Sequence, residues 1–204
     1  MTAKFVAALT MAVIVGWSGP VLAAGSKEAG QTKSAVCMAC HGMDGNSANP
    51  EWPSIASQHP SYIVKQLKHF KAGERQNPLM TPMAAMLSEQ DMEDLAAYYS
   101  AQALRPTGET EPSKVGLGQR VYRSGIMERG VPACAGCHGP TGAGNPGAGY
   151  AAIGGQHATY AALQLRAYKG GTRATDPNQM MRSVAVKLSE DEIDAVASYL
   201  QGLR

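Results

Sequence analysis

The sequence predicts an all-α protein built from two tandem copies of one small helical domain. The main observation is an internal repeat: the pattern at Cys37 returns 97 positions later at Cys134, and the segment 55–62 returns as 153–160. Self-similarity at a nearly constant separation indicates a duplicated structural unit. In both copies apolar residues recur at helical spacing, and we find no stretch with the apolar–polar alternation of a half-buried strand.

Each copy is expected to contain three helices. The first is predicted over residues 28–37 and 114–125, where it leads toward the repeated cysteine motif. The middle helix is predicted over 60–71 and 159–169, and glycines after both segments end it. Each copy therefore places its first helix before the cysteine motif and its middle helix after it.

The last helix of each copy is expected to begin after Ser88 and Ser189, where the separation between the copies has grown to 101 positions. Ser189 and Glu192 have the spacing of a capping box, in which each side chain bonds the other residue's free backbone amide. Apolar residues on one face predict a buried stripe in each helix: Met92, Leu95, Ala96 and Tyr99, then Ile193, Val196, Ala197 and Leu200.

The N-terminus predicts a secretory signal peptide over residues 1–24. Lys4 precedes an apolar stretch over 5–17, and small residues favour cleavage after Ala23 or Ala24. The stretch is shorter than the ~20 residues that span a bilayer, and an uncleaved membrane anchor is the alternative. We find no transmembrane segment in the mature chain. If the source is bacterial, the mature protein is expected in the periplasm.

The remaining chain divides into a first domain over 25–103, a linker over 104–112 and a second domain over 113–204. The linker carries two prolines and one glycine among mostly polar residues, which suits a connector. Domains of this size are marginal on a side-chain core alone. The whole chain has only two Phe and two Trp. We therefore expect a bound prosthetic group to complete each core, and the chain without it to be largely unfolded.

Two copies of one motif contain all four cysteines of the chain. They are Cys37-Met38-Ala39-Cys40-His41 and Cys134-Ala135-Gly136-Cys137-His138. Two thiols three residues apart can each add to a vinyl group of one haem, and the adjacent histidine can ligate its iron. The spacing does not suit a zinc finger, and a thioredoxin-like strand does not precede either motif. The prediction is two covalently bound haem c groups, and the alternative is four free or disulfide-bonded cysteines.

The repeat also selects a second axial ligand for each iron. Met80 stands seven residues before Leu87, and Met181 stands seven residues before Leu188. Methionine as sixth ligand raises the reduction potential and closes the iron site. Three neighbouring methionines do not recur in the repeat: Met83, Met86 and Met180. We therefore predict Met80 and Met181 as metal ligands.

The histidines outside the motifs are weaker candidates for ligands. His59 and His157 recur in register, yet each lies about 18 residues after its motif histidine and just before a helix start. Orientation of that turn by hydrogen bonding is the expected role, and a sixth ligand is the alternative. His69 has no counterpart, because Ala167 stands at its place, and is expected on the surface.

These features together resemble the dihaem cytochrome c4 family. The features are two CxxCH motifs behind a secretion signal, a Gln-His pair before the middle helix, and a methionine ahead of an LSxxD/E helix. The resemblance implies two class I cytochrome c folds with their haems close together. It also implies haem attachment at Cys37, Cys40, Cys134 and Cys137, with axial pairs His41/Met80 and His138/Met181.

One position departs from the family pattern. The first copy has Pro53 on the expected proximal side of the haem, whereas the second copy has Ala151. Loss of this proline is expected to loosen the proximal loop or alter the hydrogen bond to His138. Such a change would tune the reduction potential and leave ligation intact.

The resemblance implies an electron carrier and no catalytic residues. Expected partners are a quinol-oxidising complex or a dehydrogenase as donor and a terminal oxidase as acceptor, with no nucleic acid, and peripheral membrane association is compatible with this role. The alternatives are an electron-accepting subunit of a periplasmic dehydrogenase, such as a sulfide-oxidising flavocytochrome, and a dihaem peroxidase. The peroxidase needs an open iron site, against which the two matched methionines argue.

Charge is uneven between the two copies. Residues 24–104 carry 6 basic and 8 acidic side chains, whereas residues 113–204 carry 10 and 6. This difference would orient the molecule in the field of a charged partner. We therefore predict that the second domain docks on an acidic partner through Arg120, Arg123 or Arg173, and a merely solvated basic surface is the alternative.

Overall fold

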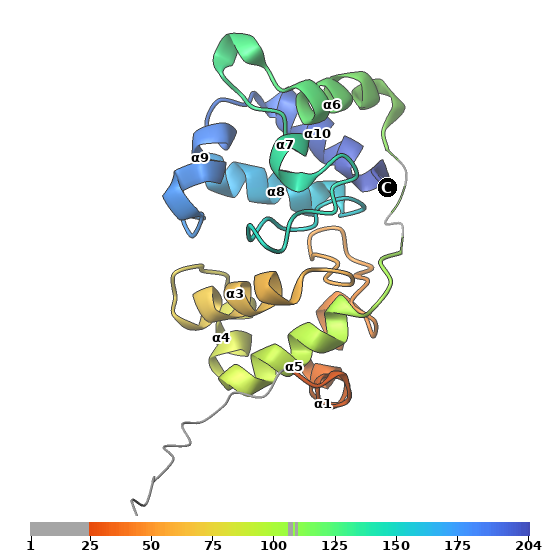
Figure 1. Ribbon diagram of the computed structural model, residues 1–204, viewed down its shortest axis with the longest axis vertical. Coiled ribbons are helices and arrows are strands. Elements are labelled where there is room, and N and C mark those ends of the chain that lie inside the picture. Colours follow the sequence, from red (N-terminus) through yellow and green to blue (C-terminus); the bar gives the residue numbers. More distant parts are fainter. Residues whose placement is uncertain (1–24, 106–107, 109) are drawn as a thin grey trace, which may run out of the picture.

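The computed structural model describes residues 25–105, 108 and 110–204, so the predicted signal peptide lies outside the described residues. Figure 1 shows two helical halves stacked along the long axis of the molecule. We call residues 25–105 the first half and residues 110–204 the second half. The middle helices of the two halves, α3 (Pro60–Lys71) and α8 (Ala158–Lys169), lie on either side of the interface between them (Figure 1).

The helices follow the same order in both halves. In the first half they are α1 (Lys27–Lys33), η1 (Ser34–Val36), α2 (Met38–His41), α3 (Pro60–Lys71), α4 (Met80–Ala85) and α5 (Glu89–Ser100). In the second half they are α6 (Pro112–Ser124), η2 (Met127–Arg129), α7 (Ala135–His138), α8 (Ala158–Lys169), η3 (Pro177–Gln179), α9 (Met180–Ala185) and α10 (Glu190–Gly202). Among the described residues, β-pairing is limited to two isolated bridges. The all-α prediction is confirmed.

Two details differ from the expected helices. The first helix was expected to run unbroken from 28 to 37, but α1 ends at Lys33 and a tighter 3-10 turn, η1, leads to the motif. Two further helices that the sequence did not predict, α4 and α9, have six residues each. Periodicity needs a window of about 11 residues or more, so helices this short leave no clear signal.

The first and last helices of each half cross in close contact at a glycine. A Cβ atom on Gly30 would lie 2.0 Å from the carbonyl oxygen of Asp94, and one on Gly118 would lie 2.2 Å from that of Ala195. Only glycine permits such an approach of two backbones. The equivalent glycines therefore give α1 on α5 and α6 on α10 the same crossing.

The predicted stripes of the last helices are buried in two separate cores. All eight residues of the stripes have 6% or less of their surface exposed. Ser189 and Glu192 form the predicted capping box, and Ser88 and Asp91 form an equivalent one. The first core contains Ile63, Val64, Met92, Leu95, Ala96 and Tyr99. The second contains Val121, Tyr122, Val131, Ala162, Leu188, Ile193, Val196, Ala197, Leu200 and Leu203. Among the described residues, none of the helices is both long and apolar enough to cross a membrane.

The carboxylate of Asp94 connects the last helix of the first half to the start of that half. The nearly buried Asp94 on α5 accepts hydrogen bonds from Ser26 N at 2.8 Å, Lys33 Nζ at 2.6 Å and Gln90 Nε2 at 3.0 Å. The bond from Lys33, followed by those from Ser26 and Gln90, holds the pKa of Asp94 below its usual value. The second half has Ala195 at this place and lacks the contact.

Asp94→Asn is expected to reduce the acid sensitivity of the fold. A lowered pKa in the folded state contributes stability above the unfolded pKa of about 4, and this contribution is lost as pH falls through the folded pKa. Thermal melts between pH 2 and 6 should therefore show a shallower decline for the variant. Asp191→Asn removes an exposed carboxylate and serves as control. Equal slopes for Asp94→Asn and wild type would contradict the prediction.

Candidate haem sites

Each cysteine motif folds into one helical turn that begins at its first cysteine. Cys37 caps α2, and the His41 amide donates to the Cys37 carbonyl at 3.0 Å. In the second half the His138 amide donates to the Cys134 carbonyl at 2.9 Å. Both thiols and the histidine of a motif therefore lie within about one turn of helix. The four thiols are not joined in disulfides, and the described residues contain no cluster of His, Cys, Asp and Glu that could hold a zinc ion.

The motif histidines are oriented by backbone carbonyls. Nδ1–H of His41 donates to the carbonyl oxygen of Pro53 at 2.9 Å, and Nδ1–H of His138 donates to that of Ala151 at 2.9 Å. Burial lowers the pKa of both imidazoles, against a smaller raising effect of the carbonyls. Neutral rings with Nδ1 occupied leave Nε2 for iron, as in metal-ligating histidines generally. The expectation that loss of the proline alters this bond is wrong, because Ala151 offers its carbonyl at the same distance.

The predicted sixth ligands occupy equivalent helices. Met80 begins α4, which packs against α3, and Met181 lies in the first turn of α9, which packs against α8. Ala84 and Ala185, both 0% exposed, also stand 101 positions apart and fix the register of the two helices. In that register Met80 and Met181 are equivalent positions, and both side chains are half-buried.

The other histidines make polar contacts through their rings. Nε2 of His59 contacts the carbonyl oxygen of Ala143 at 2.9 Å, and Nε2 of His157 contacts that of Ser47 at 2.8 Å. Each ring therefore makes a hydrogen bond, as expected, and its partner lies in the opposite half. His69, expected on the surface, is partly exposed there: 20% of its side chain is accessible, and its ring pairs with Glu74.

Two glutamines connect the halves with the same pair of bonds. Gln58 donates to the carbonyl of Ala152 at 2.8 Å and accepts from the Ala152 amide at 3.0 Å. Gln156 donates to the carbonyl of Ser54 at 2.8 Å and accepts from the Ser54 amide at 3.0 Å. The interface is thus related by a local two-fold symmetry that follows the repeat. The sequence showed the repeated Gln-His pair but gave no sign that its partners lie in the other copy.

Two arginines at the interface are nearly buried, Arg75 with 8% and Arg173 with 5% exposed. Each guanidinium donates to the side-chain oxygens of both Gln66 and Gln164, at 2.7 to 3.0 Å. Arg173 also donates to Tyr62, and Arg75 to Tyr160. The prediction that Arg173 docks a partner is therefore wrong. In the described part of the chain the acceptors of these two cations are neutral.

The positive charge of Arg75 and Arg173 affects the pKa of the neighbouring Tyr62. Burial opposes ionisation of Tyr62, yet Arg173 and then Arg75 bring its pKa below the usual value. Buried like charges need a counter-charge. A haem carries two propionate carboxylates, so a haem in each half fits this cluster as well as it fits the cysteine motifs.

Each half buries a tyrosine hydroxyl near its motif, that of Tyr122 on α6 and that of Tyr99 on α5, and the two are bonded differently. Tyr122 donates to the carbonyl of Gly139, next to His138, at 2.6 Å, and burial raises its pKa to about 12. In the first half the buried hydroxyl is that of Tyr99, which lies beside Cys37 and Ser34 but makes no hydrogen bond of normal geometry among the described residues. The first core therefore contains an unsatisfied polar group that the second does not.

Tyr122→Phe is expected to cost about 1 kcal/mol of unfolding free energy, because it removes a bond and leaves a carbonyl unpaired. Tyr99→Phe is expected to leave stability unchanged or slightly raised. Urea unfolding followed by circular dichroism measures both. An equal loss in the two variants would show that the Tyr99 hydroxyl is bonded after all.

Comparison with known proteins gives one consistent family. The sequence model described as "Cytochrome c" matches residues 27–101 and again 116–204. A cytochrome c4 of Thiocapsa roseopersicina is 51% identical over 88% of this chain and 93% of its own length. A thiosulfate dehydrogenase electron acceptor of Stutzerimonas stutzeri is 40% identical over 80% of this chain and 77% of its own. The crystal structure of reduced recombinant cytochrome c4 from Pseudomonas stutzeri superposes with a TM-score of 0.86 at 46% identity, and covers 89% of this chain and 100% of that one.

Proposed function

The chain belongs to the cytochrome c4 family, and on that premise we propose that it is a periplasmic electron carrier that passes single electrons through two His/Met-ligated haems toward a terminal oxidase. Membership of the family makes it a dihaem protein with two covalently attached haem c groups. The observation that carries the ligand assignment is the equivalence of the two sites. Each combines a CxxCH turn, an imidazole oriented by a carbonyl, and a methionine at the same place in a short helix.

Each group of residues has a separate task. Haem, when bound, supplies reversible one-electron chemistry at its iron. Cys37 and Cys40, and likewise Cys134 and Cys137, would tether it. Nε2 of His41 or His138 and the sulfur of Met80 or Met181 would hold the iron. Arg75 and Arg173 would balance propionate charge at the interface. Two methionine-capped irons leave no open site for small molecules, which suits an electron carrier and not an enzyme.

The proposal includes the route of the protein to its partners. A signal peptide over 1–24 directs export, and domains over 25–103 and 113–204, joined by the linker 104–112, fold in the periplasm. Donors are a quinol-oxidising complex or a dehydrogenase, reached in solution or by peripheral membrane association. A second candidate function is electron acceptor of a thiosulfate dehydrogenase, because a relative at 40% identity bears that name. This function would be favoured if the purified dehydrogenase with thiosulfate reduces the cytochrome faster than thiosulfate alone does.

The first experiment is an optical spectrum of the oxidised holoprotein, with the weak sulfur-to-iron charge-transfer band quantified per haem. Two equivalents are expected, because both irons would be capped by methionine. One equivalent would mean an open or histidine-ligated iron. That result would overturn the proposed ligand pairs and favour the peroxidase alternative.

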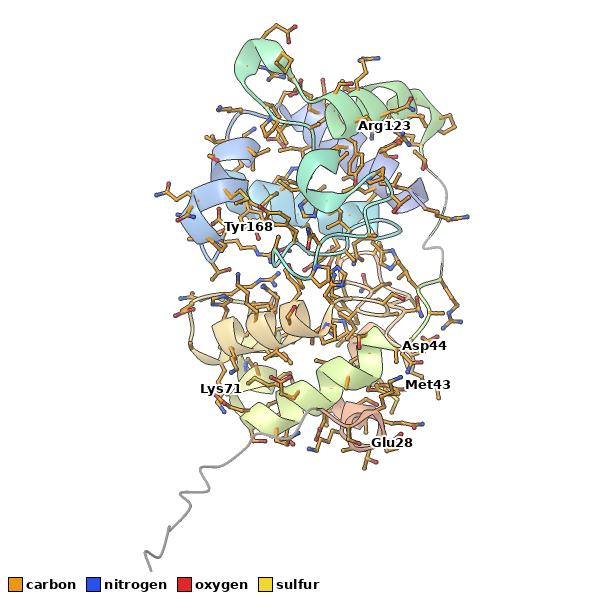
Figure 2. The ribbon with its side chains drawn as sticks, in the orientation of Figure 1. Glu28, Met43, Asp44, Lys71, Arg123 and Tyr168 are labelled. Atoms are coloured by element: carbon orange, nitrogen blue, oxygen red, sulfur yellow. The ribbon has the colours of Figure 1, made fainter. Side chains whose placement is uncertain are left out.

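Partner docking is expected to depend on the basic surface of the second half. Arg120 and Arg123 on α6 are exposed, and Figure 2 shows Arg123 far from Lys71 of the first half. Replacing Arg120 and Arg123 by Glu should lower the association rate with an acidic partner about threefold and flatten its salt dependence. Replacing Lys68 and Lys71 of the first half, both exposed, by Glu is the control with the same change of net charge. Stopped-flow mixing at several ionic strengths measures both, and equal rates for the two variants would contradict the prediction.

A further inference from the structure

The loop on the proximal side of each haem site is held from the opposite half. In the first half this loop contains Pro53, whose carbonyl orients His41, and then Ser54. Gln156 bonds both the amide and the carbonyl of Ser54. The Pro53 carbonyl that orients the iron ligand and the Ser54 amide that Gln156 bonds therefore belong to one peptide group.

The second half repeats the arrangement in the reverse direction. Ala151 orients His138, and the next residue, Ala152, is bonded at amide and carbonyl by Gln58 of the first half. Each glutamine oxygen also accepts the amide of the histidine that follows it, at 3.0 Å in both halves. The side chain is thereby fixed to the start of its own middle helix, so it is a rigid link between the helix of one half and the loop of the other.

The histidines that follow the glutamines add a second link of the same kind. Nε2 of His157 donates to the carbonyl of Ser47, and the Ser47 hydroxyl donates to the carbonyl of Cys40 at 2.9 Å. In the other direction His59 bonds Ala143, and the adjacent Gly144 donates its amide to the His138 carbonyl at 2.8 Å. Both links end at the motif turn of the opposite half.

We propose that Gln58 and Gln156 are positioning residues for the haem of the opposite half, each holding the loop whose carbonyl sets the ligand strength of the other half's axial histidine. A carbonyl that accepts from Nδ1–H makes the imidazole a stronger donor to iron, and so favours the ferric state. Loosening the Ser54 loop weakens that bond at His41. The reduction potential of the first haem then rises, while Gln156 itself belongs to the second half.

The test compares Gln156→Leu with Gln58→Leu in the holoprotein. Leucine keeps most of the volume and removes both bonds to the opposite loop, together with the bond from the amide of the following histidine. We expect Gln156→Leu to raise the equilibrium constant for reduction of the first haem at least threefold. For one electron this is a rise of about 28 mV in the reduction potential. Gln58→Leu should do the same to the second haem. Spectroelectrochemistry measures the potentials, and the hyperfine-shifted proton resonances of the two axial histidines assign each to its half.

The crossed pattern is the decisive readout. The expected result is a shift in the haem opposite to the substituted glutamine, accompanied by a change in the Nδ1–H resonance of that haem's histidine. A shift in the haem of the same half, an equal shift in both, or no shift overturns the inference. Gln31→Ala, an exposed residue of α1, is the control. Should Gln156→Leu fail to fold, Gln156→Asn shortens the link by one methylene and keeps it polar, and the same crossed shift is required of it.

The inference rests on the proposed function, in which His41 and His138 are axial ligands. The ligand assignment and the positioning role of the glutamines can fail independently. Hyperfine-shifted resonances from His41 and His138 in the wild-type protein test the ligands before any glutamine is changed. With the ligands present and the crossed shift absent, only the positioning role of the glutamines is lost.

Discussion

A chain in which all four motif cysteines are replaced by serine is expected to lose cooperative unfolding at ordinary temperature. The reason is the small size of its side-chain cores. The described residues of the first half bury six apolar side chains in one cluster, and those of the second half bury ten. Below about 80 residues a single side-chain core rarely contributes more than about 5 kcal/mol, and domains of this size are close to that limit.

The two halves should differ in this respect. The variant Cys37→Ser with Cys40→Ser should lose more helix in the first half than Cys134→Ser with Cys137→Ser loses in the second. The reason is that the first core is smaller and contains the unpaired Tyr99 hydroxyl. Far-ultraviolet circular dichroism gives the total loss of helix. Hydrogen exchange, read separately for α5 and α10, assigns the loss to a half. A sharp thermal transition of the haem-free chain would contradict the argument that the porphyrin completes each core.

Local sequence signals predicted the local parts of this fold. Ser88 and Ser189 cap their helices where the LSxxD/E pattern placed them, and the stripe from Met92 to Tyr99 is buried. The middle helix begins at Pro60 and ends at Lys71, as expected from its flanking residues. These features depend on spacing within one helix, which is readable from residue types alone.

The interface between the halves could not be predicted in the same way. Arg173 looked like a surface cation because charge is usually solvated, yet the folded chain places it against Gln66 and Tyr62, more than 100 positions away. The partners of His59 and His157 were likewise outside their own copy. A repeat reports what two copies have in common, and it does not report how the copies pack on each other. That information lies in long-range contacts, which a single sequence does not display.

Met80→Leu and Met181→Leu are each expected to abolish half of the sulfur-to-iron charge-transfer absorbance and to lower the potential of one haem by on the order of 0.1 V. Methionine stabilises the ferrous state, and leucine leaves the sixth position to water or to a histidine. The double variant should lose the whole band and gain affinity for small ligands such as cyanide. These measurements test the ligand pairs directly, because the loss is counted per haem.

The neighbouring methionines make these variants discriminating. Met83 lies one turn after Met80 on α4, so both can present sulfur from the same helix face, and Met180 precedes Met181 on α9. Side-chain burial does not separate them, since all four are half-buried. The repeat separates them. Ala84 and Ala185 fix a register in which Met83 aligns with Val184 and Met180 aligns with Leu79, so neither methionine recurs in the other half. Met83→Leu and Met180→Leu should therefore keep both equivalents of the band. Loss of the band in Met83→Leu, with retention in Met80→Leu, would mean that the two halves ligate iron from different turns, and the equivalence on which the assignment depends would be false.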